Sequence, residues 1–278
     1  MIRIESIKGK IRDLSLKNNL SSQEVLQIYF FERFLERLSK SKYRNNFVLK
    51  GGFLISSLIG IKNRTTMDMD VTVKGLPLKK EKIREIINDI SIIDVNDGIR
   101  FMIQDIHYIR EHDEYENFRV SLIANIGKTQ NPMKIDITTG DAITPVEINY
   151  SYKCIFSEND INIMAYPLET ILAEKYESII KRNVTNTRMR DFYDIYVLYK
   201  LKHDEINYTI LKKAIIRTAN RRGSTDVFNN YQDIINDMRK DAYLEKLWHI
   251  YLNENKYTDT IEYDSLFDVL DAISIKIN

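Results

Sequence analysis

Residues 47–73 read FVLKGGFLISSLIGIKNRTTMDMDVTV, and this stretch predicts most about the fold. It opens with a β-like run that ends in two adjacent glycines, Gly51 and Gly52, ahead of an apolar helical run. The segment MDMDVTV at 67–73 then alternates apolar and polar residues, which is typical of a half-buried strand. We therefore expect a strand, a glycine turn, a helix and a second strand, in this order.

Two carboxylates lie on one face of the expected second strand. Because side chains alternate across a strand, Asp68 and Asp70 point away from the apolar row that contains Met69. Adjacent carboxylates repel each other, and a divalent cation such as Mg²⁺ relieves the repulsion while bridging to phosphates. A half-exposed strand with its polar residues outward is the alternative interpretation.

A third carboxylate occurs in the segment KIDIT, residues 134–138. Asp136 points away from the face that Ile135 and Ile137 share, so it repeats the alternation of the first strand. We expect Asp136 to join Asp68 and Asp70 from a neighbouring strand. A lone acid on a purely structural strand is the alternative.

Glycine is scarce in this chain, with nine among 278 residues, so an adjacent pair is informative. At a strand-to-helix junction, Gly51 and Gly52 would let backbone N–H groups approach a phosphate at a helix N-terminus. Lys50 and Arg64 flank the segment and would pair with a triphosphate. A tight turn that needs positive φ is the alternative, although it explains one glycine better than two.

The rest of the chain divides by its hydrophobic period. A helical period predicts helices at 5–18 and 22–40, with a capping-box spacing between Ser21 and Glu24, and a charged helix at 79–92. Strand-like segments follow up to about residue 166: IRFMIQDIHYI, FRVSLIANI, MKIDITT, YKCIF and INIMAY. From Leu168 to the end the period is helical.

These patterns predict an α+β fold with an all-helical C-terminal region. We expect N-terminal helices at 1–44 that pack on the core, an α+β domain at 45–166, and a helical domain at 167–278. A cleft between two such domains is a common ligand site.

One lysine of the helical region stands on an apolar stripe. Lys175 falls in the middle of the stripe formed by Leu168, Ile171, Leu172 and Ile179. On the next helix Asp191 projects from the apolar face, with Asp194 at its edge. We expect Lys175 and Asp191 to pair, either as a buried structural ion pair or as a charged floor facing a nucleotide.

Composition excludes several classes. The single Cys154 and four histidines leave no intramolecular disulfide or multi-cysteine zinc site, and no apolar run approaches the roughly 20 residues of a membrane span. The charged start lacks the apolar core of a signal peptide, so we expect a cytoplasmic protein. Basic residues nearly balance acidic ones, 41 to 40, but 40–50 and 212–222 are basic without any acid and suit an RNA partner. A solvated helix face is the alternative for 212–222.

Gly51-Gly52, Asp68-x-Asp70 and Asp136 together resemble the nucleotidyltransferase fold of polymerase-β type. Four stretches extend the resemblance to the AbiEii / AbiGii toxin family: LKGGFLI at 49–55, RTTMDMDVT at 64–72, KIDITTGD at 134–141 and LETILAEKYESIIKRNVTNTRMRDFYDIY at 168–196. One departure is Phe53, since related enzymes often carry Ser or Thr directly after the glycines. The nearest hydroxyls here are Ser56 and Ser57.

The resemblance implies a mixed sheet followed by a helical domain that closes the nucleotide cleft. It also implies residue roles, which we take as predictions. The predicted catalytic residues are Asp68, Asp70, Asp136, Lys175 and Asp191, of which the first three hold Mg²⁺ or Mn²⁺. The predicted nucleotide-binding residues are Lys50, Gly51, Gly52, Ser56, Arg64, Arg190 and Asp194.

The implied function is that of a phage-defence, abortive-infection toxin. Such a toxin binds an NTP, with GTP or CTP favoured, and transfers a nucleotide to tRNA 3′ ends, which blocks translation. An AbiEi-like antitoxin would accompany it without a stable complex. Three alternatives remain: transfer to a protein side chain, an NTP-binding regulator without turnover, and a purely structural α+β protein. The intact Asp-x-Asp argues against the regulator, because a non-catalytic domain has no need of two adjacent like charges.

Overall fold

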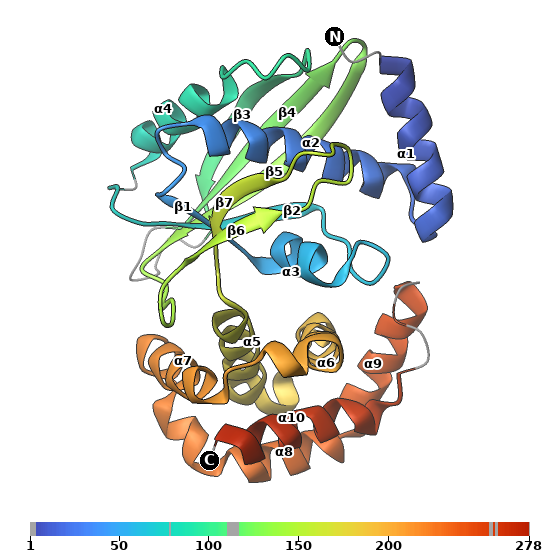
Figure 1. Cartoon of the computed structure of the whole chain (residues 1–278). Helices are drawn as coiled ribbons and strands as arrows, with labels where there is room; N and C mark the ends of the chain where they lie inside the picture. Colours follow the sequence, from blue (N-terminus) through green and yellow to red (C-terminus); the bar gives the residue numbers. More distant parts are fainter. Residues whose placement is uncertain (1–3, 78, 110–116, 256–257, 259–260, 278) are drawn as a thin grey trace. The chain divides into compact units, whose positions relative to one another are not determined.

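The computed structural model describes residues 4–77, 79–109, 117–255, 258 and 261–277 (Figure 1). Its contacts divide the chain into two compact units. Unit 1 contains Met1–Gly140 and Ile148–Ala165, and unit 2 contains Asp141–Glu147 and Tyr166–Asn278. The chain therefore passes from one unit to the other three times.

Within its described residues, unit 1 is built on a seven-stranded mixed sheet in the order β3-β4-β5-β2-β1-β7-β6. The strands are β1 (Phe47–Lys50), β2 (Asp68–Val73), β3 (Arg100–Tyr108), β4 (Phe118–Ile126), β5 (Thr129–Thr139), β6 (Ile148–Tyr152) and β7 (Ile161–Ala165). Strand β2 runs antiparallel to β1 and parallel to β5. This mixed sheet confirms the α+β prediction.

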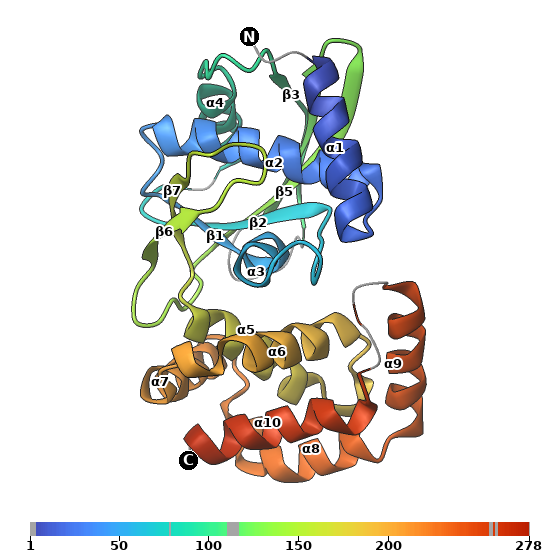
Figure 2. The same ribbon diagram turned by 45° about the vertical axis from the view of Figure 1, so that its right-hand side comes forward.

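Four helices accompany the sheet in the described part of unit 1: α1 (Ile4–Asn18), α2 (Ser22–Lys40), α3 (Gly51–Ile59) and α4 (Lys80–Ser91). Figures 1 and 2 show α2 and α4 side by side over one face of the sheet, with α3 away from them. The face under α2 carries the apolar residues of β2 and β5, such as Met69 and Ile135, which are fully buried. Burial of this alternating apolar row stabilises the layers.

Helix α2 begins with the predicted capping box. The hydroxyl of Ser21 accepts a hydrogen bond from the backbone N–H of Glu24, and the Glu24 carboxylate accepts one from the Ser21 N–H. Farther along the helix, Gln27 accepts a hydrogen bond from Asn131 of β5 at 2.7 Å. These polar contacts help to fix where α2 lies on the sheet.

The prediction of a strand at YKCIF, residues 152–156, is wrong in its position. Strand β6 ends at Tyr152. The backbone N–H groups of Ile155 and Phe156 donate instead to the carboxylate of Glu32 on α2, at 2.6 and 3.2 Å. Because a side chain satisfies these two donors, they take no part in a strand ladder.

The regular elements described in unit 2 are all helices, as predicted for the C-terminal region, and its segment Asp141–Glu147 is irregular. Its α-helices are α5 (Leu168–Arg182), α6 (Met189–Lys202), α7 (Tyr208–Arg221), α8 (Tyr231–Arg239), α9 (Ala242–Glu254) and α10 (Tyr263–Ile277). Short 3₁₀ helices lie at Asn183–Thr185, His203–Glu205 and Thr225–Asn230. Trp248 is fully buried and donates to the carbonyl of Ile261. Among the helices described, none combines the length and the apolar character that crossing a bilayer requires.

Candidate functional site

Four charged residues face one another across neighbouring strands of unit 1. In the sheet register Arg119 of β4 lies opposite Asp136 of β5, Asp136 lies beside Asp70 of β2, and Asp70 lies opposite Lys50 of β1. Directly opposed residues share a face of the sheet, and neighbouring strands are about 4.8 Å apart. We call this set the charged row: two adjacent carboxylates with one cation at each end.

Asp68 lies on the same face as the charged row. It precedes Asp70 by two residues in β2, and its partner in the register is Lys134 of β5, an exposed residue. The structure therefore brings Asp68, Asp70 and Asp136 together on one face of two adjacent strands. Their roles in metal binding and catalysis stay predictions.

Arg119 is a residue that the sequence reasoning missed. Its Nε and Nη2 donate to the two carboxylate oxygens of Asp136, each at 2.7 Å. The hydrogen bond to Asp136 raises the pKa of Arg119, and the charges of Asp136, Asp68 and Asp70 raise it further. The alternating segment FRVSL could have signalled Arg119 as a polar-face residue, but the segment alone does not say which strand lies beside it.

Gly51 and Gly52 are each in a place where a side chain would collide with a different neighbour. Gly51 has φ +65°, and a Cβ built on it would lie 2.1 Å from Oδ2 of Asp70. A Cβ on Gly52 would lie 2.9 Å from Nη2 of Arg64 and 3.1 Å from Oγ1 of Thr66. Both residues belong to the first turn of α3, where Lys50 is the N-cap and makes no side-chain capping bond. The backbone thus approaches the Asp70 carboxylate as closely as a glycine permits.

Two predicted phosphate-binding residues are buried beneath this turn. Arg64 is 2% exposed, and its guanidinium donates to the carbonyl of Thr65. Ser56 is equally buried, and its hydroxyl donates to the Arg64 carbonyl at 2.6 Å. The structure thus uses these groups inside unit 1, and their contact with a nucleotide stays a prediction.

Unit 2 contains the predicted ion pair, enlarged by one acid. The Lys175 ammonium lies 2.5 Å from Asp191 and 2.9 Å from Asp194. Burial lowers the pKa of Lys175, but the charges of Asp194 and Asp191 and their hydrogen bonds outweigh burial, so the pKa is raised. The sequence predicts Asp194 at the edge of the apolar face, whereas the structure buries its side chain completely. Neutralisation by Lys175 makes this burial tolerable.

Arg190, the remaining predicted nucleotide-binding residue, is exposed on the first turn of α6, directly before Asp191. It therefore differs from Asp191 and Asp194, which are buried on the same helix. A phosphate in solvent can reach an exposed guanidinium, and contact of Arg190 with a nucleotide stays a prediction.

Basic side chains of residues 40–50 bind partners within unit 1. Lys40 and Lys42 form ion pairs with Glu36 and Asp89, at 2.9 and 3.1 Å. Arg44 donates to the carbonyl of residue 162 at 2.9 Å. An RNA phosphate would have to compete with these contacts, which weakens the argument from charge in this stretch.

The stretch 212–222 is also partly engaged. Arg222 binds two glutamates, Glu174 and Glu177, at 2.9 and 2.8 Å. Arg217 donates to the carbonyl of Ile143 at 3.2 Å, and Lys213 is exposed on α7. Less positive charge is thus available here than the sequence alone indicates.

The donor set of unit 1 fits a hard divalent cation in its chemistry, since carboxylate oxygens are preferred ligands of Mg²⁺ and Mn²⁺. Among the described residues, however, no three His, Cys, Asp or Glu side chains lie close enough together to hold a metal ion. Both oxygens of Asp136 accept hydrogen bonds from Arg119. Asp136 would therefore have to share its oxygens between Arg119 and a bound cation.

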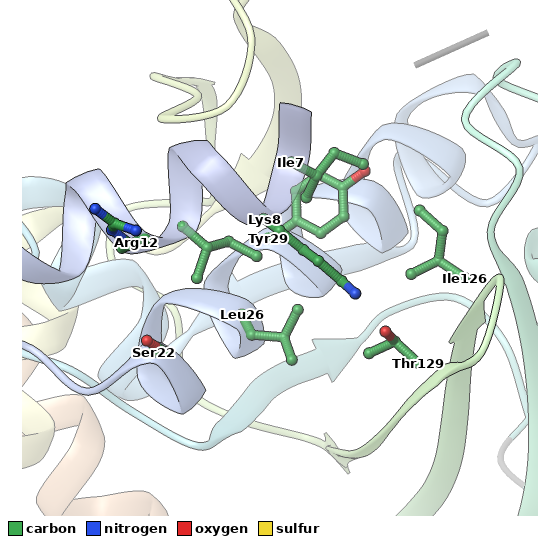
Figure 3. Close-up of a pocket in the computed structure, with 9 residues that line it drawn as sticks. Ile7, Lys8, Arg12, Ser22, Leu26, Tyr29, Ile126 and Thr129 are labelled. Atoms are coloured by element: carbon green, nitrogen blue, oxygen red, sulfur yellow. The ribbon is translucent and has the colours of Figure 1, made fainter. Parts of the chain in front are cut away.

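Unit 1 also contains a cavity of about 180 Å³ (Figure 3). Its lining comes from α1, α2, the end of β4 and the start of β5: Ile7, Lys8, Ile11, Arg12, Ser22, Leu26, Tyr29, Ile126 and Thr129. No residue of the charged row lines it, and the walls are mostly apolar. This cavity is therefore not where the carboxylates would meet a nucleotide.

Solved structures with the same fold come from Helicobacter pylori. The chain is similar to a candidate nucleotidyltransferase of this organism, with a TM-score of 0.56 and 18% identity over 93% of this chain and 97% of the other. It is also similar to JHP933 from Helicobacter pylori, with a TM-score of 0.52 and 19% identity over 93% and 94%. At such identities the likeness concerns the fold, which is that of a nucleotidyltransferase.

Sequence comparison shows the family. A search of the curated proteins found no match. The family model described as the nucleotidyl transferase AbiEii toxin of type IV toxin–antitoxin systems matches residues 33–269, which is most of the chain. The match includes the charged row and the Lys175 cluster and begins after most of the residues that line the cavity. The chain therefore belongs to the AbiEii nucleotidyl transferase toxin family and is a nucleotidyltransferase of a type IV toxin–antitoxin system.

Proposed function

We propose that this toxin transfers a nucleotide from an NTP to the 3′ end of tRNA in a Mg²⁺-dependent reaction, and that it thereby stops translation during phage infection. The observation that carries the proposal is the pair of adjacent carboxylates Asp70 and Asp136, with Asp68 on the same face. The first turn of α3 supports it, because Gly51 brings the backbone against Asp70 and the N-terminus of a helix favours phosphate.

The reaction is a displacement at phosphorus. The acceptor hydroxyl forms a bond to the α-phosphorus, the bond to the bridging oxygen breaks, and pyrophosphate leaves while the hydroxyl proton passes to a base. Asp68 and Asp70 would hold Mg²⁺ or Mn²⁺, which neutralises phosphate charge when bound. Asp136 would lower the pKa of the attacking hydroxyl, and the N–H groups at Gly51 and Gly52 would seat the phosphates.

Lys175 and Asp191 are proposed to act on the leaving group. The raised pKa keeps Lys175 charged at neutral pH, so it can offset negative charge on pyrophosphate. The ion pair with Asp191 would fix the position of the ammonium. This role requires unit 2 to reach the nucleotide, whereas a structural ion pair does not.

The proposed partners follow the family resemblance. GTP or CTP is the favoured NTP, tRNA is the acceptor, and an AbiEi-like antitoxin acts without a stable complex. The exposed Lys213 on α7 and Arg190 on α6 support an RNA contact, since phosphate binding needs local positive charge.

One assay separates the proposed function from its rivals. The purified protein is incubated with each α-labelled NTP in turn, together with total tRNA and total protein, and with Mg²⁺ or EDTA. We expect label at tRNA 3′ ends with the wild type and Mg²⁺, and loss of that label with Asp68→Ala. Label in protein would favour a protein acceptor, and NTP binding without any transfer would favour a regulator.

A matched control keeps the result specific. Asp105 lies on β3 of the same sheet, its side chain is 60% exposed, and it is outside the charged row. Asp105→Ala should retain full labelling. Equal loss of labelling in both variants would remove the support for Asp68 as a metal ligand.

A further inference from the structure

Arg119 and Asp136 form a bidentate ion pair at one end of the charged row. Both N–H···O distances are 2.7 Å, and the side chains are 30% and 15% exposed. Such fork geometry is the strongest form that an arginine–carboxylate contact takes. Asp136 is therefore neutralised by a residue of its own sheet.

This ion pair competes with the use of Asp136 as a metal ligand. A carboxylate whose two oxygens both accept from a guanidinium offers a cation only its remaining lone pairs. The guanidinium also places a positive charge next to the position that a cation would occupy. Asp70 lies beside Asp136 in the register, so the repulsion extends to the metal site that Asp68 and Asp70 would form.

We propose that Arg119 competes with the divalent metal for Asp136. Its guanidinium occupies the carboxylate oxygens of Asp136 and keeps them from binding the metal until the guanidinium is displaced. The inference rests on the proposed function, because it presumes that Asp68 and Asp70 bind the metal. Arg119 is a positioning residue in this scheme, since it acts through Asp136. Once displaced, its guanidinium is available to pair with a phosphate of the incoming nucleotide.

The surroundings of Arg119 would allow its guanidinium to separate from Asp136. The pair is partly exposed, so solvent can stabilise the separated charges at lower cost than in a closed core. Asp70 is the register neighbour of Asp136 and Asp68 lies on the same face, so both carboxylates also attract the guanidinium of Arg119. A bound cation would neutralise these same charges and so weaken the attraction that holds the arginine in place.

Direct metal binding tests the proposal without any catalysis. The full chain is titrated with Mn²⁺ in the absence of nucleotide, and the EPR signal of free Mn²⁺ gives the dissociation constant. Arg119→Gln removes the competitor, and we expect it to bind Mn²⁺ about tenfold more tightly than the wild type, because a positive charge next to the cation is removed. Arg119→Lys retains the charge without the fork, and we expect a smaller gain.

Two further variants show whether the gain passes through Asp136. Adding Asp136→Asn to Arg119→Gln should cancel the gain, because the carboxylate that was released is then missing. Lys134→Gln removes a positive charge next to Asp68 on the same face, whereas Arg119 lies opposite Asp136. It should change the dissociation constant by much less than Arg119→Gln does.

Unchanged or weaker Mn²⁺ binding in both Arg119→Gln and Arg119→Lys would overturn the proposal, as would a gain that persists without Asp136. An equal gain in Mn²⁺ affinity from Lys134→Gln would show that any loss of positive charge on this face has the same effect. That result would overturn the proposal as well. Failure of the proposed function has a different signature, namely Mn²⁺ binding by the wild type that Asp68→Asn leaves unchanged. Circular dichroism confirms folding, and Arg119→Lys decides the outcome if Arg119→Gln does not fold.

Discussion

Gly51 is restricted by its backbone and by the space around it. Its φ of +65° is unfavourable for any residue with a Cβ, and that Cβ would overlap the Asp70 carboxylate. Gly51→Ala should lower the free energy of unfolding by about 1–3 kcal/mol and should also abolish nucleotidyl transfer, because Asp70 must move. Urea denaturation and the tRNA labelling assay measure the two effects.

Gly98 provides the matched comparison for Gly51. It has φ +71°, but a Cβ there would meet nothing within 4 Å. Gly98→Ala should therefore show the backbone cost alone and retain activity. If both variants lost activity alike, the contact between Gly51 and Asp70 would not explain the requirement for glycine.

For Lys175 we predict how much the loss of its positive charge lowers the stability of the fold. Lys175→Met leaves the buried carboxylates of Asp191 and Asp194 without their cation, so the free energy of unfolding should fall by about 3–5 kcal/mol at neutral pH. The control is Lys202→Met, which breaks the pair with the exposed Glu205 and should cost less than about 1 kcal/mol.

The pH dependence of this effect has a definite sign. The pKa of Lys175 is raised above its ordinary value of 10.5, so the folded protein holds this proton more tightly than the unfolded chain does. The stabilisation is complete below pH 10.5 and is lost as the pH rises through the raised value. The difference in stability between wild type and Lys175→Met should therefore shrink at strongly alkaline pH. A difference that stays constant would argue against the ion pair as its source.

At the scale of elements, α2 depends on one buried ion pair. Arg37 binds both oxygens of Asp97 at 2.7 Å and also donates to the carbonyl of Ile99, just before β3. Both charged side chains are almost fully buried. Arg37→Met should lower the free energy of unfolding by about 3–5 kcal/mol, because it leaves the Asp97 charge buried alone.

Lys40→Met on the same helix tests whether burial decides the cost. Its ion pair with Glu36 is half exposed, so the loss should stay below about 0.5 kcal/mol. Urea unfolding of the two variants gives the comparison. A cost for Arg37→Met as small as for Lys40→Met would show that the buried pair does not anchor α2.

Elements were easier to predict from the sequence than the contacts between them. The period of two in MDMDVTV and KIDIT predicts which faces Asp68, Asp70 and Asp136 occupy, because the alternation is a local property of a strand. The neighbour of each strand is not local. Arg119 lies opposite Asp136 because β5 turns back on β4 across Gly127 and Lys128, so the register follows only once this turn is located.

The same limit explains the other misses. The segment after Tyr152 has strand-forming residues, yet Glu32, more than a hundred residues earlier, binds its backbone. The full burial of Asp194 likewise depends on a lysine from another helix. Long-range partners decided these cases, and a single sequence reveals such partners only through a family resemblance.

For the whole molecule, the toxin family predicts a link between chemistry and growth. Expression of the wild type in a bacterial host should slow growth, whereas Asp68→Ala should leave growth unaffected at equal protein levels. Asp105→Ala should be as toxic as the wild type, because Asp105 lies outside the charged row. Growth curves with immunoblots measure this, and a toxic Asp68→Ala would separate toxicity from nucleotidyl transfer.

The short excursion of residues 141–147 into unit 2 has a consequence for how such genes can evolve. Asp141 accepts a hydrogen bond from Tyr166 and Thr144 exchanges two with Thr170, before the chain returns to unit 1 for β6 and β7. A crossover between related genes at any single point would therefore leave at least one unit with segments from two parents. Recombination can exchange a complete unit only by breaking the gene at all three passages. We therefore expect related genes to inherit the two units together.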